Sequence, residues 1–149
     1  MKSARMIVCE LLEKLEKSAY SNLALDGVLQ CSDVSARDKA FISRLFYGVI
    51  ERKATLDYII SLYSSKPIQK LDAVILETLR MGIYQLLYMD SVPDNAAVNE
   101  SVELVKQLGK KSAAPFVNAV LRSFIRDDKN FALPKDRIQK FCVEYSCSA

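Results

Sequence analysis

The chain has 149 residues, of which 50% are hydrophobic and 26% are charged, and its formal net charge is +3. This length suits one domain, or two small halves that share a core, and the apolar content argues against disorder. The sequence has no histidine and only four dispersed glycines, which excludes imidazole-based catalysis, histidine-containing zinc sites and a glycine-rich phosphate-binding loop in this chain.

The first half of the chain predicts four helices, because apolar residues recur there at three- and four-residue spacing. They are expected over residues 4–19, 23–29, 36–50 and 56–63. The predicted N-caps are Ser21 or Asn22 for the second helix, Ser35 for the third and Thr55 for the fourth. A loop that contains Pro67 is expected to follow.

The stretch from Leu71 to Met89 differs because its apolar residues surround the helix instead of forming one stripe, which is typical of a central, buried helix. Its charged residues, among them Glu77 and Arg80, argue against a membrane span. Gly82 lies in its middle, where glycine costs about 1 kcal/mol relative to alanine. We therefore expect another helix to approach closely at Gly82.

The remaining sequence predicts three more helices. A turn at residues 91–93 leads into a helix that Asp94 or Asn95 can cap and that Gly109 ends. A further helix carries apolar residues over 116–125, and a less regular one is expected over 134–145, after a polar loop. With about eight helices and no convincing strand, the prediction is an all-α bundle.

The sequence shows no pattern typical of a zinc site, a membrane span or a secretory signal. The four cysteines lack the paired spacing of a zinc site, and no 18-residue window is free of charge. The N-terminal residues lead into an acidic segment that does not resemble a secretory signal. We therefore expect a cytoplasmic protein with reduced cysteines, no metal and no membrane contact.

Charge is distributed unevenly. Acids dominate from Asp72 to Leu104, whereas Val105 to Arg126 contains only basic charges. Such clusters suit contact with a phosphate backbone, and solvated helix faces are the alternative. The first candidate group for such phosphate contact contains Lys2, Arg5, Arg37, Lys39, Arg44, Arg52 and Lys53. The second contains Lys110, Lys111, Arg122 and Arg126.

The other notable polar residues indicate structural roles and not catalysis. Asn99 and Asn118 interrupt apolar runs, and because asparagine is unfavourable inside helices, each needs a hydrogen-bonding reason. We expect buried amides that join neighbouring helices, with RNA contact as the alternative. Glu100 and Glu103 form a carboxylate pair without a base or metal ligand beside it, so no catalysis by this chain is expected.

A family resemblance rests on three long segments, which read RDKAFISRLFYGVIERKATLDYII over 37–60, LRMGIYQLLYMDSVPDNAAVNESVELVKQLG over 79–109 and FVNAVLR over 116–122. They resemble the NusB-like N-terminal domain of the ribosomal RNA cytosine-5 methyltransferases (the RsmB, Sun or Fmu family), in the family's order and over about 2–145. The antitermination factor NusB shares the fold, but it tends to have Glu in place of Gln85. One departure is Asn95, where the family often has histidine.

The resemblance implies a NusB-like bundle of two sub-bundles packed around the 71–89 helix, as one domain over 1–149. It implies binding of 16S ribosomal RNA, positioned for cytosine-5 methylation by a C-terminal domain that binds S-adenosylmethionine. We interpret the chain as an N-terminal fragment without that domain and without a cofactor of its own. Its implied partners are ribosomal RNA and its own methyltransferase domain. The alternatives are a NusB-type antitermination factor that binds RNA and a ribosomal protein, and a domain that only stabilises its enzyme.

Overall fold

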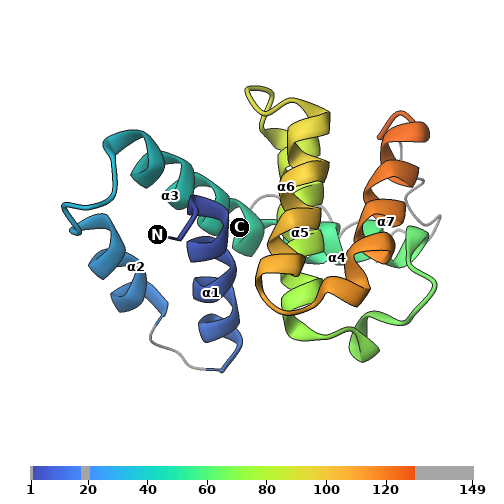
Figure 1. Cartoon of the computed structure of the whole chain (residues 1–149), viewed down its shortest axis with the longest axis horizontal. Coiled ribbons are helices and arrows are strands. Elements are labelled where there is room, and N and C mark those ends of the chain that lie inside the picture. The colour runs from blue at the N-terminus through green and yellow to red at the C-terminus, as the bar shows by residue number, and fades with distance from the viewer. Residues whose placement is uncertain (1, 18–20, 130–149) are drawn as a thin grey trace.

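The computed structural model describes residues 2–17 and 21–129, which form seven α-helices and two 3-10 turns without a strand (Figure 1). The predicted all-α class is confirmed, whereas the helix predicted over 134–145 lies outside the described residues. The elements are α1 (Ala4–Lys17), α2 (Ser21–Leu29), α3 (Ala36–Glu51), α4 (Lys53–Tyr63), η1 (Ile68–Lys70), α5 (Ala73–Tyr88), α6 (Asp94–Gln107), η2 (Lys111–Ala113) and α7 (Ala114–Arg126).

The helices form two sub-bundles that share α5. Helices α1, α2 and α3 contact one another on the left of Figure 1, and α5, α6 and α7 do so on the right. Helix α5 also contacts α1, α3 and α4, and ten consecutive residues, Glu77 to Leu86, are buried along it. The expected central helix is confirmed, because an all-round apolar surface is stable only when neighbours cover every side.

Two predicted helix ends are confirmed. The Ser35 hydroxyl oxygen accepts a hydrogen bond from the backbone N–H of Asp38 at 3.1 Å, as an N-cap does. Gly109 has a φ of +79°, and the N–H groups of Gly109 and Lys110 donate to the carbonyls of Lys106 and Val105 at 3.2 and 2.7 Å. This Schellman arrangement favours glycine because a side chain disfavours positive φ.

Two other predicted caps are wrong. Helix α4 begins at Lys53, one residue after Arg52, so Thr55 lies buried inside its first turn. Helix α6 follows Pro93 without a side-chain cap, and Asn95 instead accepts a hydrogen bond from Arg122. In both cases tertiary contacts, which short-range propensity does not include, decide what the polar side chain does.

Two glycines of the helix interiors mark close contacts of α5. A Cβ built at Gly82 would lie 3.0 Å from the Leu121 methyl groups of α7 and 3.1 Å from the Ser101 hydroxyl of α6. A Cβ built at Gly48 of α3 would overlap the ring of Tyr84. The sequence reading singled out Gly82 and overlooked Gly48, although both positions bring a second helix against α5.

Candidate functional site

A groove of about 560 Å³ lies where the two sub-bundles meet, between the N-terminal halves of α1 and α3 and the loop that joins α5 to α6. Arg5, Arg37 and Arg44 line it, and Asp38 is the one acid among its lining residues. Three positive charges and one negative charge leave the lining with two net positive charges. The other walls are mainly apolar and comprise Ala4, Ala40, Phe41, Met89, Ser91, Val92, Pro93 and Ala96.

Arg5 is half-buried at the edge of this groove. Its Nε donates a hydrogen bond to Gln85 Oε1 at 2.8 Å, and its guanidinium lies over the Phe41 ring, 4.9 Å from the centroid. Burial lowers the pKa of Arg5, and the Glu100 carboxylate opposes that shift. Arg5 stays cationic at neutral pH, because an arginine pKa starts far above neutrality.

Arg44 is anchored at the C-terminal end of α5. Its Nη2 donates to the backbone carbonyl of Tyr88 at 2.6 Å, in the last turn, where carbonyls lack partners inside the helix. Arg52 lies over the Tyr88 ring, 4.1 Å from its centroid. The Tyr88 backbone and ring therefore fix two arginines on this side of the molecule.

The other members of the first predicted group lie outside the groove lining. Lys2 forms an ion pair with Glu10 at 2.9 Å, and Lys53 forms one with Glu16 at 2.7 Å. Lys39 is half-buried on α3. The structure thus gathers Arg5, Arg37 and Arg44 around one opening, and their sequence order alone could not show this.

The second predicted group is divided between the two ends of the α6–α7 pair. Lys110 follows the end of α6 and forms a 3.0 Å ion pair with Asp72, the N-cap of α5, and Lys111 is exposed next to it. At the other end, Arg122 donates to the Asn95 side-chain oxygen at 3.2 Å and Arg126 donates to the Ser123 hydroxyl at 2.8 Å.

The prediction of buried amides at Asn99 and Asn118 is wrong, because both residues are exposed. The buried face of α6 contains Val98 and Ser101, and one residue of helix turns the next side chain by about 100°. Asn99 therefore points away from the core. The apolar runs around the two asparagines suggested burial, but the rotational position of each helix places them outside.

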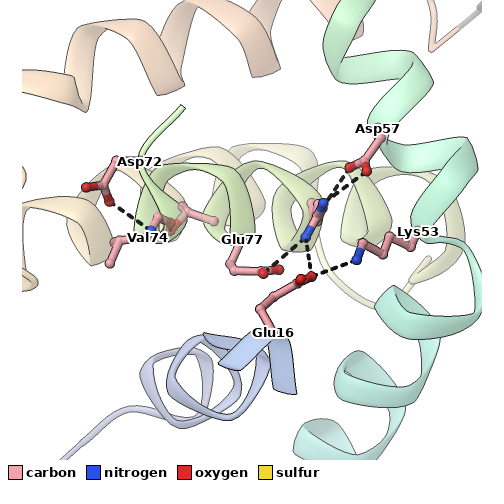
Figure 2. Close-up of polar contacts among 8 residues, drawn as sticks. Glu16, Lys53, Asp57, Asp72, Val74 and Glu77 are labelled. Carbon is pink, nitrogen blue, oxygen red and sulfur yellow. Dashed lines mark hydrogen bonds and ion pairs between the residues drawn. The ribbon is translucent and has the colours of Figure 1, made fainter. Parts of the chain in front are cut away.

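A cluster of charges around the buried Arg80 links three helices, and the sequence reading missed it (Figure 2). Arg80 of α5 donates through Nε and Nη2 to the two Asp57 oxygens of α4 at 2.7 and 2.9 Å. Its Nη1 donates to Glu77 at 3.0 Å and to Glu16 of α1 at 3.3 Å. Lys53 also binds Glu16. The available signal was a single arginine in an apolar helix, with an acid three residues earlier.

Burial and charge act in opposite directions within this cluster. Burial alone would lower the pKa of Arg80, but the Asp57 and Glu77 carboxylates outweigh it and raise the pKa. For Glu77, burial raises the pKa more than Arg80 lowers it. Glu77 Oε1 has no hydrogen-bond partner, which is consistent with three carboxylates that share one guanidinium.

The partners of the groove arginines differ from those of several other cations. Lys2, Lys53, Arg80 and Lys110 bind carboxylates. Arg5 and Arg44 instead bind an amide oxygen and a peptide carbonyl, which hold an arginine in place without cancelling its charge. This arrangement can receive a polyanion, because guanidinium donors match phosphate oxygens in geometry and charge.

The described residues also bear on metal ions and membranes. Over 2–17 and 21–129, no group of three or more cysteine, aspartate or glutamate side chains is arranged to hold a metal ion. None of the helices in that part of the chain is long and apolar enough to cross a membrane.

Comparison with known proteins gives one family and two kinds of relative. The profile of the NusB family matches residues 2–126. The chain is 38% identical to a "Probable ribosomal RNA small subunit methyltransferase B" of Bacillus subtilis, over 97% of this chain and 32% of that protein. A protein with the same name from Synechocystis is 36% identical over 87% of this chain and 29% of its own length.

The second kind of relative is shorter. A "Transcription antitermination protein NusB" of Nocardioides is 37% identical over 80% of this chain and 96% of that protein. The chain therefore spans about a third of the methyltransferase relatives and most of the antitermination relative.

Proposed function

Because the chain belongs to the NusB family, we propose that it is an RNA-binding domain and that the groove between α1, α3 and α6 receives the RNA backbone. The observation that carries this proposal is the set of three arginines around one opening, two of them held by neutral oxygens. Phosphate contacts supply most of the affinity of such interfaces.

Each part of the groove has a role in this mode of binding. Arg37 and Arg44 offer exposed guanidinium groups, which can bind a phosphate through two parallel hydrogen bonds. Helix α6 has no side-chain cap, so the backbone N–H groups of its first turn can add hydrogen-bond donors beside the groove. The Phe41 ring contacts the Arg5 guanidinium in a cation–π interaction.

The methyltransferase relatives favour a more specific role. Identity of 38% extends over 97% of this chain in the Bacillus subtilis protein. We propose that the domain positions small-subunit ribosomal RNA for cytosine-5 methylation by a separate domain, which would bind S-adenosylmethionine and carry out the chemistry. Its partners would be the RNA and that catalytic domain, and no residue of this chain would take part in methyl transfer.

A second candidate is a role in transcription antitermination, with RNA and a ribosomal protein as partners. Its support is the Nocardioides relative, 96% of which this chain matches. Reading the coding sequence that follows the Ala149 codon separates the two candidates. A methyltransferase domain there supports the first, and a stop codon supports the second.

RNA binding is tested by the salt dependence of affinity. Each phosphate contact adds about −0.7 to the slope of log affinity against log salt for a single strand, so three arginines predict a slope near −2. The double reversal Arg37→Glu with Arg44→Glu should abolish most of this slope. The matched control is Lys66→Glu with Lys70→Glu, an equal change of charge at exposed positions outside the groove lining. Equal loss of affinity in both variants, or no RNA binding by the unaltered chain, would refute the proposal.

A further inference from the structure

One buried amide of α5 is hydrogen-bonded to a groove arginine. Gln85 is 1% exposed, and its side chain makes two hydrogen bonds. Its Oε1 accepts from Arg5 Nε at 2.8 Å, and its Nε2 donates to the backbone carbonyl of Met81 at 2.9 Å. A buried polar side chain with both ends bonded is rigid, so the position of Arg5 depends on it.

The chemistry of the partners fixes the direction of this amide. A guanidinium only donates hydrogen bonds and a carbonyl only accepts them. Gln85 must therefore present its oxygen to Arg5 and its nitrogen to Met81. The reverse orientation would place donor against donor and acceptor against acceptor.

The neutrality of Gln85 determines how much charge Arg5 offers. In the described part of the chain no carboxylate forms an ion pair with Arg5, and Glu100 acts on it only from a longer range. A glutamate at position 85 would have nearly the same shape as glutamine but would pair with the guanidinium. Arg80, surrounded by carboxylates, represents that neutralised state within the same protein.

We propose that Gln85 is a positioning residue that sets the RNA affinity of the groove, because it holds Arg5 toward the opening without neutralising it. This inference rests on the proposed function. The exchange Gln85→Glu should convert Arg5 from a phosphate-binding cation into half of an internal ion pair, so that the groove presents one positive charge fewer.

The expected effect follows from counterion release. The loss of one phosphate contact should make the salt slope of RNA binding shallower by about 0.7 and lower affinity about five-fold at 0.1 M salt. Gln85→Met removes the anchor but leaves Arg5 charged, so we expect weaker binding with nearly the original slope. Arg5→Met should reproduce the slope of Gln85→Glu.

The test measures the anisotropy of a fluorescein-labelled, mixed-sequence RNA oligonucleotide with the full chain and these variants over a range of salt concentrations. Thermal melting by circular dichroism checks that each variant is folded. In the Arg5→Met background, Gln85→Glu should have no further effect on the slope, which a merely structural role for Gln85 would not predict.

The outcomes separate this inference from the function on which it rests. Salt-dependent binding by the unaltered chain, with the same slope in Gln85→Glu, would overturn the role of Gln85 and leave RNA binding in place. An unchanged slope in Arg5→Met would also overturn it. If Gln85→Glu does not fold, Gln85→Met decides, because binding at the original affinity would contradict a positioning role. If the unaltered chain does not bind RNA, both proposals fail.

Discussion

The molecule uses arginine in two different ways, once inside α5 and once at the C-terminal end of that helix. Arg80 is 5% exposed and binds three carboxylates from α1, α4 and α5. Arg44 is exposed and binds one peptide carbonyl at the end of α5. The partner therefore decides the role of the side chain, because carboxylates neutralise the guanidinium charge whereas neutral oxygens leave it available to a ligand.

The same comparison applies between the groove and the second predicted basic group. Lys110 is paired with Asp72, whereas Arg122 and Arg126 bind an amide and a hydroxyl oxygen. Arg122 lies beside the first turn of α6, close to the loop that lines the groove. If RNA extends beyond the groove, Arg122 is the member of the second group that is placed to meet it.

The largest expected effect on stability concerns the charge cluster around Arg80. Arg80→Met should lower the free energy of unfolding by about 3–5 kcal/mol, because the buried Glu77 carboxylate and the half-buried Asp57 carboxylate lose their cation. Urea denaturation measures the loss. Lys53→Met, which breaks an exposed ion pair with the same Glu16, should cost about 1 kcal/mol or less. Equal costs would show that the cluster does not depend on burial.

The second effect concerns the close contact between Gly48 of α3 and the Tyr84 ring of α5. Gly48→Ala should destabilise the fold by about 1–3 kcal/mol, because the added methyl group overlaps the Tyr84 ring and overpacks the interface of α3 with α5. Thermal or urea unfolding tests this expectation. The control combines it with Tyr84→Leu, which removes the ring end, and the penalty of the alanine should then shrink.

The third expectation is the pH dependence of the buried cluster. The pKa of Glu77 is raised in the folded state, so the folded state binds its proton more tightly than the unfolded chain does. The contribution of Glu77 to stability therefore falls as pH rises through and above its ordinary pKa of 4.5. Glu16 and Asp72 have lowered pKa values, so their contributions are lost as pH falls below that range.

The variant Glu77→Gln isolates the first of these contributions. Unfolding free energies of the unaltered chain and of Glu77→Gln, measured across pH 4.5 and above, should show the unaltered chain losing stability relative to the variant as pH rises. A difference that is independent of pH, or of opposite sign, would contradict the raised pKa.

The smallest effect on stability is expected on the groove side. Arg44→Met removes one exposed hydrogen bond to the Tyr88 carbonyl and should change the free energy of unfolding by about 1 kcal/mol or less. Its affinity for RNA should nevertheless fall about five-fold at 0.1 M salt, by the loss of one phosphate contact. Arg80→Met is the same change of residue type, and the two variants should differ in effect. Arg80→Met should mainly lower stability, whereas Arg44→Met should mainly lower RNA affinity. A large loss of stability in Arg44→Met would contradict the contrast between the two arginines.

Local signals in the sequence were sufficient for most of the described fold. Apolar spacing predicted the helices and the buried position of residues 71–89. Ser35 predicted the start of α3, and Gly109 predicted the end of α6. These features depend on residues within one or two turns of each other. The family followed from the same segments, since they contain long, ordered signatures, and the NusB family profile matches residues 2–126.

The candidate site was less accessible to sequence reasoning. All three groove arginines were among the predicted contacts, but so were Lys2 and Lys53, which carboxylates neutralise. Nothing local to a basic residue distinguishes these cases, because the partners lie up to 80 positions away, as Gln85 does from Arg5.

Local sequence patterns were therefore enough to predict the helices, the cap at Ser35, the end at Gly109 and the family. Folding in three dimensions gathers certain cations around one opening, turns Asn99 toward solvent and buries Arg80 among acids. The two differ because helix formation depends on neighbours within a few residues, whereas the charge that a side chain offers depends on groups brought beside it by folding.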